Sequence, residues 1–524
     1  MASTEPNPYD EVQYLSHPYH QTHPDHLYTL GRLFGVEAVP YSEAHVLELG
    51  CASGGNIIPM AANAPLGQYL GIDLAKKQIE AGQSNIQELG LKNIKLEHQS
   101  IQNFDSSSEK FDYIICHGIY SWVDSEVRDK IMSVCHNHLK PNGIAYVSYN
   151  TFPGWNMVKS VRDMMLYHAQ NFESPQRRAQ EARGILKFIV DGLEGENSPY
   201  ALLLRNEINL LSKQPDSYLL HDHLESVNYP VYLYQFVEHA NKYKLAYLSD
   251  TPLFTMYPNN LPKKVADELN KIHDIVRVGQ YMDFVRNQRF RCTLLCHQEH
   301  KINRNLNTDD ITKFHVAYNG KPTTISEDKF KEGEPVEFVG SGITLTVRNY
   351  LSKVAMTILN EAKGLPMNYN ELVDKVMSRA KESDRNKVQI TLNRDLNLLR
   401  LALGGLVTLH SSLPNYLLNV TEKPQVMSFV RYQAKEGPMV TNQRHQVVGL
   451  NPVERVLVSY LDGKHSKKDL IKKISEHVEK KDFTIKGEGD SPVTDPKDIA
   501  QKSEQFCEQI LMNFAKNALL VNPR

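Results

Sequence analysis

Short apolar runs alternate with amphipathic stretches over the first 150 residues of the chain. Runs of strand length lie at 46–49, 68–73, 94–98, 111–116 and 143–150. Between them, the stretches 74–89 and 124–139 repeat their apolar residues at the period of an α-helix. Strands that alternate with helices in this way predict a doubly wound parallel sheet.

A glycine-containing loop follows the first of these strands, in the sequence VLELGCASGG at 46–55. A loop of small residues at the carboxyl end of a parallel strand opens onto a helix N-terminus and accommodates a nucleotide-like cofactor. Glu48 stands two residues before Gly50. A carboxylate there would repel a pyrophosphate, whereas it suits a ligand with a cationic end. The loop therefore favours S-adenosylmethionine, which carries an amino group and a sulfonium, over a dinucleotide.

A second acid, Asp73, ends the second predicted strand, 25 residues after Glu48. An acidic side chain in this place can accept hydrogen bonds from both hydroxyls of a ribose. The alternative is that the loop merely turns the strand into the helix, with Asp73 as the cap of the next helix.

Four features together resemble the class I S-adenosylmethionine-dependent methyltransferases: the acid-containing loop, Asp73, FDYIICHG at 111–118 and HLKPNG at 138–143. The segments 11–35, 116–123, 148–156 and 280–297 resemble, more narrowly, the bacterial methyltransferases that carry a methyltransferase regulatory domain. Within that group the chain is most similar to the rickettsial-type protein lysine methyltransferases that modify an outer-membrane surface protein. The similarity is specific over about the first 300 residues and loose beyond them.

The loop, the second acid and this resemblance predict a set of site residues. Those expected to bind the cofactor are Glu48, Gly50, Cys51, Ala52, Gly54, Asn56, Asp73, Leu74, Ser100, Ile101, His117 and Gly118. Many relatives place an acid at Ser100 to hold the adenine amino group, so we expect backbone contacts to adenine near Ser100 and Ile101.

The acceptor should lie beyond the carboxyl ends of the fourth and fifth strands. The residues there that we expect to act in catalysis are Tyr120, Trp122, Tyr149, Asn150 and Trp155. Aromatic rings suit a cationic amine and a sulfonium, and Tyr149 and Asn150 are the candidates for orienting the amine. The alternative is that the aromatic residues only pack helices onto the sheet. No Asn/Asp-Pro-Pro-aromatic stretch follows the fourth strand, which argues against the usual pocket for base or glutamine amides.

The fold class that follows is α/β: a Rossmann-like, seven-stranded class I methyltransferase sheet with a helical insertion, plus C-terminal α+β winged-helix-like modules. Residues 155–213 predict successive amphipathic helices, so the last two strands should come later, at the end of 231–250 and at 290–297, the final one antiparallel. Two stretches after residue 350 share the order helix, glycine-containing turn, helix, helix, short strand, which suggests winged-helix-like modules.

A chain of 524 residues is too long for one hydrophobic core and should divide into about three units. We expect an N-terminal cofactor-covering segment (1–40), the methyltransferase core (41–154), the helical insertion (155–229), the end of the catalytic sheet in the regulatory-domain region (230–300), a β-rich connector (301–345), and winged-helix-like modules at 346–420 and 445–524.

Charge and composition limit the classes of partner that we expect this chain to bind. Lys and Arg number 59 against 61 Asp and Glu, which provides no electrostatic argument for nucleic-acid binding. No secretion signal and no apolar run of spanning length occur, and the six cysteines are scattered. We therefore expect a cytoplasmic enzyme without membrane insertion, whose partner is a protein with accessible lysines. For the C-terminal modules we expect protein docking or homodimer contacts.

Two histidine-containing clusters raise the question of a metal. His17, His20, His23 and His26 recur every third residue, and Cys292, Cys296, His297 and His300 lie close together. Pro18 and Pro24 break a shared helical face, and strand alternation makes the two cysteines ordinary buried thiols, so no metal is predicted. Two other functions remain open: methylation of a small molecule or of another amino-acid side chain, and a non-catalytic protein that senses S-adenosylmethionine.

Overall fold

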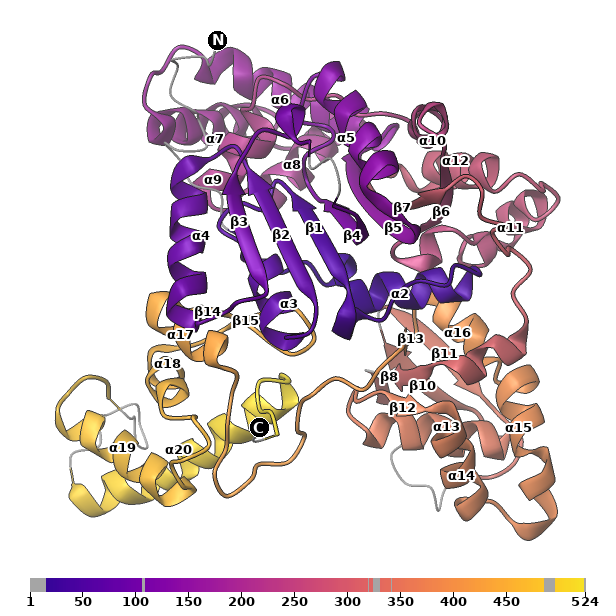
Figure 1. The fold of residues 1–524 in the computed structure, drawn as a ribbon, viewed down its shortest axis with the longest axis vertical. Helices are drawn as coiled ribbons and strands as arrows, with labels where there is room; N and C mark the ends of the chain where they lie inside the picture. The colour runs from indigo at the N-terminus through magenta and orange to yellow at the C-terminus, as the bar shows by residue number, and fades with distance from the viewer. Residues whose placement is uncertain are drawn as a thin grey trace.

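A mixed seven-stranded sheet forms the centre of the protein (Figure 1). The computed structural model describes residues 16–105, 109–318, 320–323, 330–340, 342–484 and 495–522. The first fifteen residues of the predicted N-terminal segment lie outside this description.

The strands of the central sheet are β1 (His45–Leu49), β2 (Gln68–Asp73), β3 (Ile94–His98), β4 (Phe111–Cys116), β5 (Leu139–Asn150), β6 (Leu245–Asp250) and β7 (Phe290–His297). Their order is β3-β2-β1-β4-β5-β7-β6, and β7 runs antiparallel to both of its neighbours. The predicted Rossmann-like sheet is confirmed. Strand order reverses between β1 and β4, so the carboxyl ends of these two strands border the crevice where such sheets bind ligands.

The helices between the first strands are α3 (Ile57–Asn63), α4 (Lys76–Leu89) and α5 (Ser125–His138), with the short helix η3 (Ile101–Asn103) after β3. Gly90 ends α4 in a left-handed conformation, and the Asp124 carboxylate starts α5 by accepting the Val127 N–H at 2.9 Å. Strand β5 begins at Leu139, earlier than the predicted residue 143, and its pairing with β4 is irregular between Phe111 and Tyr113.

The predicted helical insertion separates β5 from β6 and has a hydrophobic core of its own, at the top of Figure 1. It consists of α6 (Gly154–Ala169), α7 (Pro175–Gly192), α8 (Pro199–Leu211), α9 (Asp216–Tyr218) and η4 (Leu219–His223). The chain returns to the sheet through α10 (Leu233–Lys242) and β6. It then passes η5 (Leu253–Thr255), η6 (Pro258–Asn260), α11 (Lys263–Leu269) and α12 (Ile275–Arg286) before β7.

The N-terminal segment forms η1 (His20–Thr22), α2 (Pro24–Leu33) and η2 (Tyr41–Glu43). A proline in the first turn and the His23 side chain, which accepts the Asp25 N–H at 3.2 Å, begin α2. Ser411 and Ser412 of the C-terminal half donate to the Asp25 carboxylate. Helix α2 therefore joins the sheet to the lobe below it in Figure 1.

The first C-terminal lobe contains η7 (Thr308–Lys313), β8 (His315–Tyr318), β9 (Lys321–Pro322), β10 (Val336–Gly340), β11 (Ile343–Val347), α13 (Tyr350–Glu361), β12 (Met367–Asn368), α14 (Tyr369–Arg379), η9 (Glu382–Lys387), α15 (Val388–Ile390), η10 (Thr391–Asp395), α16 (Leu398–Gly404) and β13 (Val407–His410). Strand β8, from the predicted connector, pairs with both β12 and β13. The small sheet of this lobe thus includes a strand that lies before residue 346, the predicted start of the first winged-helix-like module.

The second C-terminal lobe has a separate hydrophobic core. Its elements are α17 (Ser428–Glu436), β14 (Met439–Thr441), β15 (Val447–Gly449), α18 (Pro452–Ser459), α19 (Lys467–Glu479) and α20 (Pro496–Lys516). Helix α17 lies before residue 445, where the predicted module begins, and it shares this core. The antiparallel hairpin β14–β15 is called the wing below. Figure 1 shows the wing to the left of α3, at the lower edge of the central sheet.

No helix in the part of the chain that the structure describes combines the length and apolar composition of a membrane span.

Candidate cofactor and acceptor site

The glycine loop turns sharply at the carboxyl end of β1. Gly50 and Gly54 have φ angles of +75° and +79°, which residues with a Cβ rarely adopt. A Cβ at Gly50 would also overlap the side chain of Ile119. The N–H groups of Gly50 and Cys51 both donate to the Ile72 carbonyl, at 2.9 and 3.0 Å. The small residues are therefore required by the path of the loop.

Glu48 is buried at the base of this loop, with 4% of its surface exposed. Its Oε1 accepts a hydrogen bond of 2.6 Å from Asn56 Nδ2, whereas its Oε2 is buried without a partner. The pKa of Glu48 is raised to about 8, chiefly by burial; the Asn56 hydrogen bond opposes this rise, and the nearby Asp73 adds to it. A buried carboxyl with one unpaired oxygen fits a ligand that presents a cationic hydrogen-bond donor, such as the ammonium group of S-adenosylmethionine.

Asp73 is held beside the loop at the end of β2. Its two carboxylate oxygens accept the N–H groups of Ala52 and Ala75, each at 2.8 Å. These bonds orient the carboxylate at the end of β2, and a contact from it to the cofactor ribose stays a prediction. Leu74 follows with 58% of its surface exposed and offers an apolar face for a base.

Ser100 and Ile101 stand after β3, which pairs with β2 so that His98 lies opposite Asp73. The Ser100 hydroxyl accepts the Gln102 N–H at 3.2 Å and thereby caps η3. Ile101 is half-buried. The cap engages the Ser100 side chain locally, and backbone contacts to adenine at this position stay a prediction.

His117 and Gly118 follow β4, next to the glycine loop. The His117 ring lies 4.0 Å from the ring of Tyr19, centroid to centroid, and its Nδ1 is 2.9 Å from the Tyr146 hydroxyl. Burial lowers the pKa of His117 to about 4, so the ring is neutral near pH 7. Gly118 donates its N–H to Ser148 Oγ at 2.8 Å, and a Cβ built on it would meet nothing within 4 Å. Open space adjoins the crevice at this point.

The N-terminal segment lies directly on the loop. Gly55 donates its N–H to Ser16 Oγ at 2.7 Å, and a Cβ at Gly55 would overlap the Ser16 carbonyl. Asn56 Oδ1 accepts the Tyr19 N–H at 2.9 Å, and Asn56 Nδ2 donates to Thr22 Oγ1 at 3.0 Å. That this segment covers the cofactor stays a prediction; these contacts place it in reach.

Tyr120 and Tyr149, two of the predicted catalytic residues, are buried against α10. The Tyr149 ring stacks on Phe236 at 4.0 Å, and its hydroxyl is 3.1 Å from Thr293 Oγ1. The Tyr120 hydroxyl is 2.7 Å from His239 Nδ1. The two hydroxyls thus have partners within the protein, and their contacts match the packing alternative. A catalytic role for either residue stays a prediction.

Trp122, Trp155 and Asn150 make up the rest of the predicted acceptor side. The two indole rings meet edge to face at 6.0 Å, with Trp155 buried and Trp122 half-buried. Asn150 is 5% exposed, and its Nδ2 has no hydrogen-bond partner. Unused polar capacity therefore remains at the carboxyl end of β5.

A buried ion network in the last part of the sheet was not predicted. Arg291 donates from Nε to Asp283 Oδ2 at 2.9 Å and from Nη1 to Asp250, while Thr293 Oγ1 donates to Asp250 at 2.7 Å. Burial raises the pKa of Asp283 to about 6, although the Arg291 charge opposes this shift. Opposite charges within an otherwise apolar sheet were the available signal in the sequence.

The two clusters weighed as metal sites contain His17, His20, His23 and His26, and Cys292, Cys296, His297 and His300. Among the described residues, no group of three or more His, Cys, Asp or Glu side chains could hold a metal ion. Cys292 and Cys296 are buried thiols of β7. His20 and His23 lie where the N-terminal segment meets the second C-terminal lobe, within ring contact of His26 and His445 respectively.

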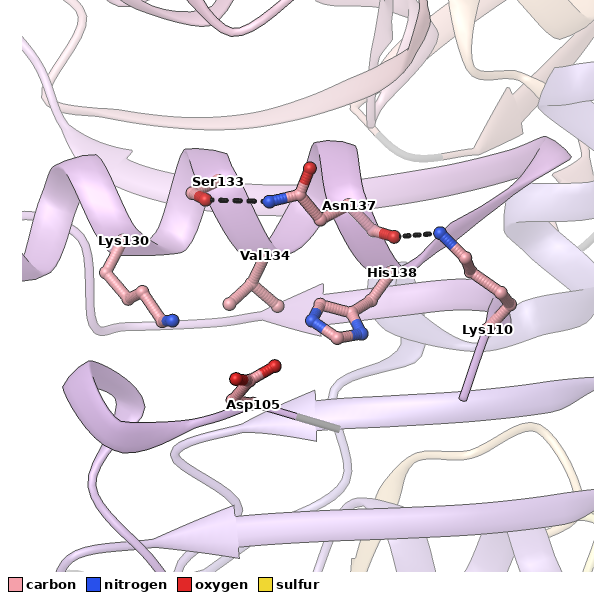
Figure 2. A pocket seen from close by; sticks show the side chains of 7 residues that line it. All are labelled: Asp105, Lys110, Lys130, Ser133, Val134, Asn137 and His138. Carbon is pink, nitrogen blue, oxygen red and sulfur yellow. Dashed lines mark hydrogen bonds between the residues drawn. The ribbon is translucent and has the colours of Figure 1, made fainter. Parts of the chain in front are cut away.

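Two cavities, each of about 340 Å³, lie at the amino-terminal side of the sheet, away from the glycine loop. Figure 2 shows one of them, where Lys130, Val134 and His138 project from α5 toward Asp105. Lys110 donates to the Asn137 carbonyl at the end of α5, a placement that suits the negative end of a helix dipole. The Lys110 contact stabilises the helix end, and we assign no ligand to the cavity.

Comparisons with known proteins place the chain in a family. Residues 41–189 match the family described as "Methyltransferase domain", residues 215–297 the "Predicted methyltransferase regulatory domain", and residues 422–519 the "PKMT, C-terminal winged helix domain". An uncharacterized protein of Rickettsia prowazekii is 42% identical over 98% of this chain and 94% of its own. A second one from that organism is 46% identical over 45% of this chain and 94% of its own.

Among solved structures, PKMT2 from Rickettsia typhi in complex with AdoHcy is 36% identical, with a TM-score of 0.89 over 97% of this chain and 100% of that chain. The predicted cofactor, S-adenosylmethionine, and the predicted enzyme class are confirmed. The winged-helix expectation is confirmed for the C-terminal end. The chain belongs to the same family of S-adenosylmethionine-dependent methyltransferases as PKMT2 of Rickettsia typhi.

Proposed function

We propose that this enzyme transfers methyl groups to lysine side chains of a protein, and that its substrate is an outer-membrane surface protein. The observation that carries the proposal is the likeness to PKMT2, a protein lysine methyltransferase by name, along 97% of the chain. The substrate class rests on the resemblance of the first 300 residues to the rickettsial-type enzymes.

The chemistry requires a neutral lysine amine. When bound, the cofactor supplies a sulfonium methyl group, whose carbon bonds to the amine nitrogen as the carbon–sulfur bond breaks and sulfur keeps the electron pair. With an ordinary pKa near 10.4, only about one lysine in a thousand is neutral at pH 7.4, a handicap of roughly 4 kcal/mol. Desolvation beside a cation lowers that pKa.

The chain's own residues orient the reactants. Glu48 would hold the ammonium end of the cofactor and Asp73 its ribose, and Gly118 after β4 leaves open space. Trp122 and Trp155 present ring surface to an approaching amine. Since the Tyr120 and Tyr149 hydroxyls already have partners, no dedicated base is assigned, and the amine proton leaves to solvent before attack. Positioning then supplies most of the rate enhancement.

The test is to incubate the full-length protein with S-adenosylmethionine labelled in its methyl group, together with a purified lysine-containing outer-membrane protein and, separately, with a cell lysate. Label on lysine side chains, located by peptide mass spectrometry, is the expected result. Label on small molecules alone would favour the small-molecule alternative, and no transfer at all would overturn the proposal. The Glu48→Gln variant, which keeps the shape of the site, is the matched control.

We also infer a reducing, cytoplasmic setting, because all six cysteines are free and buried. Homodimerisation stays a prediction.

A further inference from the structure

The wing of the second C-terminal lobe reaches the base of the cofactor site. His445, at the turn between β14 and β15, is 4% exposed, and its Nε2 lies 2.8 Å from Asn56 Oδ1. Asn56 is the residue whose Nδ2 holds Glu48 Oε1 at 2.6 Å. One side chain thus separates the wing from the buried acid.

The hydrogen bonds of Asn56 allow only one orientation of its amide. The Tyr19 backbone N–H can only donate, so the atom that faces it at 2.9 Å must be the amide oxygen. His445 bonds to the same oxygen and must therefore donate from Nε2. The amide nitrogen is then turned toward Thr22 and Glu48, at 3.0 and 2.6 Å. All four hydrogen-bonding positions of the amide are used.

The wing turn is itself held in place. Asn442 Oδ1 accepts the N–H groups of Arg444 and Gln446, each at 2.9 Å. His20 Nδ1 is 3.1 Å from the Arg444 carbonyl, which ties the turn to the N-terminal segment. Burial lowers the pKa of His445 well below its ordinary value, so the ring is neutral and its single N–H is the one on Nε2.

We propose that His445 is a positioning residue of the cofactor site: from the C-terminal winged-helix domain it orients the Asn56 amide, which in turn presents a donor to Glu48. The wing, an element often used to contact nucleic acid, is here part of the methyltransferase unit. Cofactor affinity then depends on the docking of a domain about 390 residues away in sequence. The proposal rests on the assignment of Glu48 to the cofactor.

The test uses full-length variants and the affinity for adenosylhomocysteine, measured by calorimetry. His445→Leu keeps bulk and removes the donor, and we expect the Kd to rise about tenfold, with a similar rise in KM for S-adenosylmethionine and kcat within twofold. His445→Gln keeps an N–H donor and should bind within threefold of wild type. His477→Leu is the control, because His477 is a hydrogen-bonded histidine of the same domain, on α19, and bonds to Asp482 and Tyr460.

A double-mutant cycle separates positioning from packing. With Asn56→Ala already present, His445→Leu should change the Kd by less than twofold, because its target is gone. Equal weakening by the Leu and Gln variants, additive effects with Asn56→Ala, or a Kd within twofold of wild type for His445→Leu would each overturn the inference.

Nuclear magnetic resonance provides a readout that does not depend on the folding of His445→Leu. In protein labelled with ¹⁵N-histidine, the Nε2–H signal of His445 is identified as the signal that the His445→Gln variant lacks. In the wild-type protein this signal should shift when adenosylhomocysteine is added, and an unchanged signal would contradict the inference. If wild type and His477→Leu bind adenosylhomocysteine but label no protein, the proposed substrate class fails and this inference stands. If wild type binds no adenosylhomocysteine, the cofactor site itself is wrongly assigned.

Discussion

Binding of the cofactor product should release a proton from Glu48. The pKa of this carboxyl in the free protein is about 8, so about 0.9 of the molecules carry the proton at pH 7. An ammonium group placed against Oε2, the oxygen without a partner, favours the ionised form. Adenosylhomocysteine has the same ammonium group as the cofactor. We therefore expect about 0.9 proton to leave per ligand bound at pH 7.

The sign of the pH dependence follows from the raised pKa. Below pH 8 the free protein holds a proton that binding must remove, so affinity falls as the pH falls, by about tenfold from pH 7 to pH 6. The same shift affects folding. The folded protein retains this proton up to about pH 8, whereas the unfolded chain loses it near pH 4.5. Glu48 therefore lowers the stability of the free protein progressively as the pH rises from 4.5 to 8.

Calorimetry counts the protons directly. The binding enthalpy of adenosylhomocysteine is measured at pH 7 in several buffers of different ionisation enthalpy, and the slope reports protons released. Glu48→Gln cannot titrate and should release about 0.9 proton fewer than wild type. Glu97→Gln removes an exposed carboxylate from β3 and should behave as wild type. Equal proton release by wild type and Glu48→Gln would refute the reasoning, because the acid would then not face the ligand's cation.

Three further perturbations test other parts of the structure. Gly50→Ala places a Cβ at a φ of +75° against Ile119, so adenosylhomocysteine should bind at least about tenfold more weakly in calorimetry; unchanged affinity would contradict the loop geometry. Arg291→Met leaves two buried carboxylates without their cation and should cost about 3 kcal/mol or more, seen as a melting temperature several degrees lower; adding Asp283→Asn should recover part of the loss. Tyr149→Phe removes a hydroxyl that bonds to Thr293, so kcat should stay within about threefold, and a hundredfold loss would restore the residue as catalytic.

Local sequence patterns were enough to predict much of the candidate site. The strand, the acid and the small residues at 46–55 are contiguous, and a glycine needed for a positive φ is visible in the sequence. Asp73 could be placed because strands of known length alternate with helices, which brings their carboxyl ends to one edge. The seven strands, including the late and antiparallel β7, were predicted for the same reason.

A local pattern does not show which element of the fold covers each face of a strand. Tyr149 and Asn150 are neighbours on β5, and alternation points successive side chains to opposite faces, so the two could not both orient one amine from the same side. Only packing shows that α10 covers the Tyr149 face and that Thr293 receives its hydroxyl.

The sequence by itself determined the order of the elements in the central sheet, the fold class and the places of Glu48 and Asp73 near the carboxyl ends of β1 and β2, because these depend on short-range periodicity and on residues next to one another. The tertiary structure alone decided which residues that are distant in sequence contact one another. His445 meets Asn56 across 389 positions of sequence, and Arg291 meets Asp250 from another strand. Such contacts arise when separate hydrophobic cores dock and when strands pair over long distances, and no local pattern records which surfaces will meet.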